Sequence, residues 1–134
     1  MKRLLRHVFV ALVATMVWSC AGRENIALQY PDDASNRVKF AAEHLTGVLE
    51  GKGYRVIEAA EGDKIIRLSE ATDSVGPKEG FTISSADNII DVKGNDGSGV
   101  IYGCRELADR LEMDGNLDNL PAEFTDAPEM VLRG

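Results

Sequence analysis

The chain has 134 residues and a formal net charge of −7, with 22 acidic residues against 15 basic ones. This length fits one ordinary domain and is too short for two. The acidic balance disfavours nucleic acid and anionic lipid headgroups as partners, because both present negative phosphate groups. The acidic residues form no continuous block, so we interpret them as a solvated surface.

The first 19 residues have the composition of a targeting segment, with a basic head followed by an apolar core over residues 8–18. This core is too short to span a bilayer, which takes about 20 residues. The segment ends Val-Trp-Ser-Cys, which resembles the lipobox of bacterial lipoproteins. The resemblance implies that Cys20 carries the lipid and anchors the chain in the cell envelope of a bacterium. The alternative is an ordinary secretory signal followed by an unrelated cysteine.

If Cys20 is acylated, Cys104 has no partner for a disulfide and is best explained as a small buried apolar residue. Residues 20–25 then form a short tether. The first half of the remaining chain predicts one strand, one helix and two more strands. The expected ranges are residues 26–30 for the first strand, about 36–50 for the helix, and 54–59 and 64–69 for the next two strands.

A hairpin, a glycine-rich turn and a second helix follow over residues 80–111. Apolar and polar residues alternate in 81–84 and again in 90–93, as expected of half-buried strands. Asp96 or Ser98 can cap the helix that comes next. Its apolar stripe contains Val100, Cys104, Leu107, Ala108 and Leu111.

These elements predict an α+β fold, a two-layer sandwich in which two helices pack on one face of a mixed sheet in the order β-α-β-β-β-β-α. We expect the domain to cover residues 26–115. Residues 116–134 are predicted to form a linker and the start of an interrupted apolar strand at 127–134. The six aromatic residues after the leader are expected to be mostly buried: Tyr30, Phe40, Tyr54, Phe81, Tyr102 and Phe124.

Residues that would carry chemistry are few. After the leader the sequence contains one histidine, His44, which lacks a second ligand at helical spacing and is expected to face solvent or pack partly. Residues 94–99 join a strand to a helix but lack both the Gly-Lys-Ser/Thr ending and the dinucleotide fingerprint. The sequence therefore predicts no catalytic residue, no metal ligand and no cofactor, and it assigns residues 94–99 to a structural turn.

The strand, turn and helix block resembles the small N-terminal domain of certain bacterial glycoside hydrolases, the α-glucuronidases and β-N-acetylhexosaminidases. The resemblance rests on Phe81, Ile83, Ile90, Val92, Gly94, Asp96, Gly99, Val100, Ile101, Tyr102, Gly103, Leu107 and Leu111. It implies a non-catalytic accessory domain that supports a catalytic (β/α)₈ barrel. Residues 127–134 are similar to the linker and first barrel strand of these enzymes, which ends in an Arg-Gly pair.

By this resemblance Arg133 is the one candidate contact to a sugar, because its guanidinium offers several donors in a rigid fork. The expected function is the accessory domain of a glycoside hydrolase in polysaccharide breakdown, inactive alone, with the barrel as its missing partner. The alternative is a free-standing envelope lipoprotein that binds a glycan or a protein. A small enzyme in its own right has little support.

Overall fold

The computed structural model describes residues 23–72 and 76–127. Within these residues the chain forms six strands and two helices. The first half contains β1 (Asn25–Gln29), α2 (Asn36–Gly51), β2 (Arg55–Ile57) and β3 (Lys64–Glu70). The second half contains β4 (Phe81–Ala86), β5 (Ile89–Gly94), α3 (Gly97–Asp114) and β6 (Glu123–Asp126).

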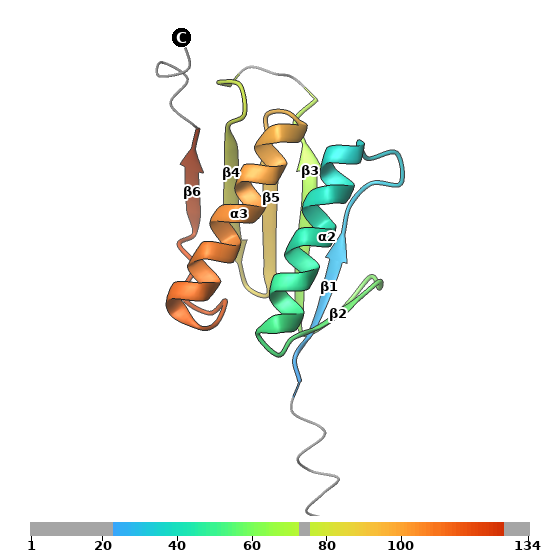
Figure 1. Cartoon of the computed structure of the whole chain (residues 1–134). Coiled ribbons are helices and arrows are strands. Elements are labelled where there is room, and N and C mark those ends of the chain that lie inside the picture. Colours follow the sequence, from blue (N-terminus) through green and yellow to red (C-terminus); the bar gives the residue numbers. More distant parts are fainter. Residues whose placement is uncertain (1–22, 73–75, 128–134) are drawn as a thin grey trace, which may run out of the picture.

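The six strands form one mixed sheet in the order β2-β1-β3-β5-β4-β6. Four neighbouring strands, β2, β1, β3 and β5, run parallel to one another, whereas β4 is antiparallel to both β5 and β6. Helices α2 and α3 lie side by side across one face of this sheet (Figure 1). The predicted α+β two-layer sandwich is confirmed.

The core lies between the helices and the sheet, and strand alternation decides which side chains reach it. On β5, Ile90 and Val92 face the helices, while Asp91 and Lys93 face the other way. Ile83 of β4 stands beside Val92 in the antiparallel register, so both contribute to the same layer. The largest fully buried side chains are Ile26, Leu45, Leu49, Ile66, Leu68, Ile83, Leu107, Leu111, Val38, Val92, Val100 and Cys104.

Each helix begins at a polar cap that the sequence supplies. The Ser35 hydroxyl accepts a hydrogen bond from the Val38 N–H at the start of α2, and the Asp96 carboxylate accepts one from the Gly99 N–H at the start of α3. Helix α3 ends at Gly115, whose positive φ of 78° is the left-handed geometry in which glycine carries no steric penalty.

The structure differs from the sequence-based expectation at the C-terminal edge. The sequence pattern predicts no strand between residues 116 and 126, yet β6 pairs with β4 and completes the sheet. Phe124 anchors this strand, because its ring lies 6.2 Å from that of Phe81 and beneath the Arg110 guanidinium at 4.3 Å. A strand of only four residues with acidic ends gives too weak an alternation pattern to be recognised in the sequence.

No helix among the described residues is long and apolar enough to cross a membrane.

Candidate functional site

Two residues singled out from the sequence, Cys20 and Arg133, lie outside the described residues. The third, His44, is exposed on the outer surface of α2, as expected. Within residues 23–72 and 76–127, no group of three or more histidine, cysteine, aspartate or glutamate side chains is arranged to hold a metal ion.

The glycine-rich turn after β5 is filled by the protein's own backbone. One Asp96 carboxylate oxygen accepts the Gly99 N–H at 2.8 Å, and the other accepts the Glu79 N–H at 3.0 Å. A Cβ atom on Gly99 would lie 2.2 Å from the Gly80 carbonyl oxygen, and one on Gly94 would lie 2.4 Å from the Val100 nitrogen. This crowding supports the interpretation of residues 94–99 as a structural turn.

Cys104 is fully buried on the inner side of α3. Burial raises the pKa of its thiol to about 12, because the apolar core disfavours the thiolate. Since the thiolate is the reactive form, the thiol is inert at neutral pH. The expectation of a buried apolar cysteine is confirmed.

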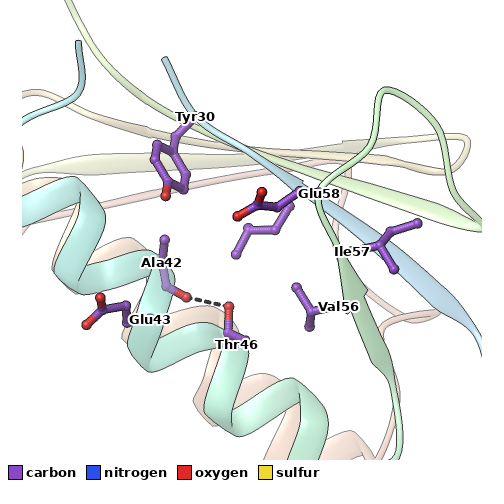
Figure 2. Close-up of a pocket in the computed structure, with 8 residues that line it drawn as sticks. Tyr30, Ala42, Glu43, Thr46, Val56, Ile57 and Glu58 are labelled. Carbon is purple, nitrogen blue, oxygen red and sulfur yellow. Dashed lines mark hydrogen bonds between the residues drawn. The ribbon is translucent and has the colours of Figure 1, made fainter. Parts of the chain in front are cut away.

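A concave pocket of about 390 Å³ lies between α2 and the β2 edge of the sheet. Its walls come from α2, from the end of β1 and from β2 with the residue that follows it. Figure 2 shows Tyr30 and Glu58 on the sheet side facing Ala42 and Thr46 of α2. We call this pocket the α2–β2 groove. Its lining residues are Leu28, Tyr30, Ala42, Glu43, Thr46, Val56, Ile57 and Glu58.

The groove combines apolar and polar surface. Leu28 and Ala42 are buried and form apolar surface, and Tyr30 is 40% exposed. The Thr46 hydroxyl donates to the Ala42 carbonyl oxygen at 2.7 Å, so its lone pairs remain available as acceptors. The carboxylates of Glu43 and Glu58 have no hydrogen-bond or ion-pair partner among the described residues.

The sequence pattern does not reveal this groove, because it predicts that most of the aromatic side chains are buried. Of the six aromatic residues, Phe81 is buried, and Tyr54, Tyr102 and Phe124 are half-buried. The expectation is wrong for Tyr30 and for Phe40, which is 60% exposed on the outer surface of α2. Phe40 lies off the apolar stripe of its helix, and Tyr30 comes directly before Pro31, where the strand has ended. The sequence context of both residues therefore already indicated that their side chains are exposed.

The family of the chain follows from a comparison with known families. The family model described as glycosyl hydrolase family 20, domain 2, matches residues 13–125. The chain belongs to this family. The match includes both helices and the first five strands of the described domain, and it extends into β6.

Solved structures of glycoside hydrolases contain the same domain 2 fold. A GH138 enzyme that targets pectin rhamnogalacturonan II is 37% identical with a TM-score of 0.70, over 81% of this chain and 16% of that enzyme. The GH20 β-N-acetylhexosaminidase from Streptomyces coelicolor A3(2) is 20% identical with a TM-score of 0.57, over 84% of this chain and 25% of that enzyme. A glycoside hydrolase family 20 β-N-acetylglucosaminidase is 22% identical with a TM-score of 0.50, over 81% of this chain and 20% of that enzyme.

This family 20 domain 2 chain therefore spans a quarter or less of the length of these three enzymes. No curated protein sequence matches it. The domain is a glycoside hydrolase-associated module with two helices on a mixed sheet, and the family assignment concerns this module rather than a catalytic centre.

Proposed function

We propose that the chain is the non-catalytic N-terminal accessory domain of a polysaccharide-degrading glycoside hydrolase, and that a catalytic (β/α)₈ barrel is its partner. The observation that carries the proposal is the domain 2 match over residues 13–125, in a chain that corresponds to 16% of the similar GH138 enzyme. The domain's part in the whole enzyme is to support the barrel. The catalytic groups that cleave the glycosidic bond would belong to that barrel.

The arrangement of the described residues is consistent with a supporting role. The two carboxylates of the α2–β2 groove, Glu43 and Glu58, are exposed on an open surface, whereas general acid–base catalysis needs a carboxyl group held within reach of the reacting proton. The domain offers a rigid sheet with one face covered by helices, which suits a structural neighbour of a larger domain.

The proposal is tested by reading the coding sequence beyond residue 134 in the source genome and assaying both forms of the protein. We expect several hundred further residues with a barrel pattern of alternating strands and helices. The longer protein should hydrolyse a glycan, and the 134-residue chain should not. Hydrolysis of any glycoside by the 134-residue chain alone would refute the non-catalytic role.

The lipid anchor is a second part of the proposal. Its support is the Val-Trp-Ser-Cys sequence at residues 17–20 after a short apolar core. Labelling of bacteria with a radioactive or alkyne-tagged fatty acid should mark the wild-type chain and leave Cys20→Ala unmarked. Release of an unlipidated wild-type chain into the periplasm would indicate an ordinary secretory signal instead.

Arg133 is proposed to donate hydrogen bonds to sugar hydroxyls once the barrel surrounds it. In the longer protein, Arg133→Ala should reduce kcat/KM by about 10- to 100-fold, because a hydrogen bond from a charged group contributes about 1.5–3 kcal/mol. Arg105→Ala on the exposed face of α3 is the control and should leave kcat/KM unchanged. A wild-type kcat/KM for Arg133→Ala would show that Arg133 does not contact the sugar.

A further inference from the structure

The α2–β2 groove has the dimensions of a ligand site. Its volume of about 390 Å³ falls within the range of roughly 300–1,000 Å³ found for small-molecule pockets. A second, smaller hollow of about 280 Å³ adjoins it and shares Leu28, Tyr30 and Glu58 with it. Together the two hollows form an open trough at the end of β1, because both are lined by Leu28, Tyr30 and Glu58.

The surface of the trough presents an aromatic ring together with carboxylates. The exposed ring of Tyr30 offers an electron-rich face against which the C–H groups of a pyranose ring can pack. Carboxylate oxygens are available on Glu58 and Glu43, and each can accept a hydrogen bond from a hydroxyl group. Such a surface matches a ring that is apolar on one face and carries hydroxyl donors at its edge.

The charge of the trough restricts the ligand further. Among the residues that the structure describes, the lining of the two hollows includes Asp32, Glu43 and Glu58 but no lysine or arginine. A uronic acid or a sulfated sugar would place its anion against these carboxylates, which is unfavourable. A neutral sugar avoids this repulsion and gains charge-assisted hydrogen bonds, so electrostatics favour a neutral ring over an acidic one.

We propose that the α2–β2 groove is a carbohydrate subsite that takes one neutral pyranose ring of a glycan chain, with Tyr30 as the stacking surface and Glu58 as the main acceptor. The choice of a glycan as ligand rests on the proposed function, because the partner barrel would act on the same polymer. The subsite would hold a glycan near the enzyme without contributing to bond cleavage.

The test is a titration of the ¹⁵N-labelled 134-residue chain, followed by amide chemical shifts. The neutral probes are N,N′-diacetylchitobiose, methyl α-L-rhamnoside and methyl β-D-galactoside, the acidic probe is galacturonic acid, and the cationic probe is arginine amide. We expect a neutral probe to shift the amide signals of Tyr30, Thr46 and Val56 in a saturable way with a millimolar Kd. Galacturonic acid should shift these signals far less at equal concentration.

Three variants identify the groups responsible. Tyr30→Ala should weaken binding of the neutral probe by about tenfold or more, and Glu58→Gln should weaken it while retaining the side-chain shape. Phe40→Ala is the control. It removes an aromatic ring on α2 that is more exposed than Tyr30 and lies outside the groove, so it should leave the Kd of the neutral probe unchanged. The dispersion of the amide spectrum reports whether each variant is folded.

The proposal is overturned if none of the neutral probes shifts the groove amides at millimolar concentration, or if folded Tyr30→Ala binds as tightly as the wild type. Saturable shifts with arginine amide alone would also overturn it and would make the groove a cation site. Neither result affects the accessory-domain proposal, which depends on the downstream coding sequence and on the activity of the longer protein.

Discussion

Replacing Gly103 by alanine tests how closely α3 approaches the sheet. A Cβ atom at this position would lie 2.6 Å from Val92 Cγ1, whereas ordinary contact begins at 3.4 Å, and it would lie 3.3 Å from the Phe81 ring. Val92 is branched at Cβ and held in the middle of the core, so it has little freedom to rotate away. The added methyl group must therefore push the helix and the sheet apart.

Two effects of opposite sign set the change in the free energy of unfolding that Gly103→Ala causes. Alanine in place of glycine in a helix stabilises the folded state by about 1 kcal/mol through helix propensity. Overpacking a core contact costs about 1–3 kcal/mol. The free energy of unfolding of Gly103→Ala should therefore fall by about 0–2 kcal/mol. Gly103→Val should lose about 3 kcal/mol, because it adds two more methyl groups and gains less propensity.

Gly47 provides the matched control. It lies in α2, it is exposed, and a Cβ atom there would meet nothing within 4 Å. Gly47→Ala should therefore gain the full propensity term of about 1 kcal/mol. Urea denaturation of both alanine variants measures the difference between them, which we expect to be about 1–3 kcal/mol. Equal stabilisation of the two variants would refute the inference that α3 packs closely against β5 at Gly103.

Four further results are expected. Asp96→Ala should lower the free energy of unfolding by about 1–2 kcal/mol, because the carboxylate accepts two backbone N–H groups, and Asp109→Ala on the exposed side of α3 should not. The Cys104 thiol should resist iodoacetamide at pH 8 in the folded chain and react after urea unfolding; rapid alkylation without denaturant would contradict its burial. Because its pKa is raised from 9.0 to about 12 in the folded state, the unfolded chain ionises first, and stability should fall as the pH rises from 9 towards 12. Arg110→Ala should cost about 0.5–1 kcal/mol through the lost contact with Phe124, and hydrogen exchange should quicken selectively at the β6 amides; unchanged exchange would show that the contact does not hold this strand.

The fold was largely predictable because its determinants are local. The alternation of Ile90 and Val92 with polar residues defines a strand, and the spacing of Val38, Ala41 and Leu45 defines a helix face. Capping by Asp96 was also visible, since an acidic residue before an apolar helical pattern is a recognisable start signal. These patterns suffice for two helices on one face of a sheet.

The parts that were missed depend on contacts between distant residues. Strand β6 exists because Phe124 packs on Phe81 and Arg110, and nothing in residues 123–126 alone reveals those partners. The α2–β2 groove likewise forms where α2, β1 and β2 come together, which is a tertiary property. The roles of Cys20 and Arg133 stay predictions, because both lie outside the described residues.

The directions of the first and last strands of the described chain, β1 and β6, have a mechanical consequence. Because β6 runs parallel to β1, the beginning of β1 and the end of β6 lie at opposite ends of the sheet (Figure 1). Tension applied between residues 25 and 126 would therefore act along the strands. The hydrogen bonds between β4 and β6 are perpendicular to that direction, so they would be loaded together in shear rather than broken one at a time. A pull between these two points would therefore have to break the β4–β6 hydrogen bonds together, and β6 would resist it better than a strand that is peeled off.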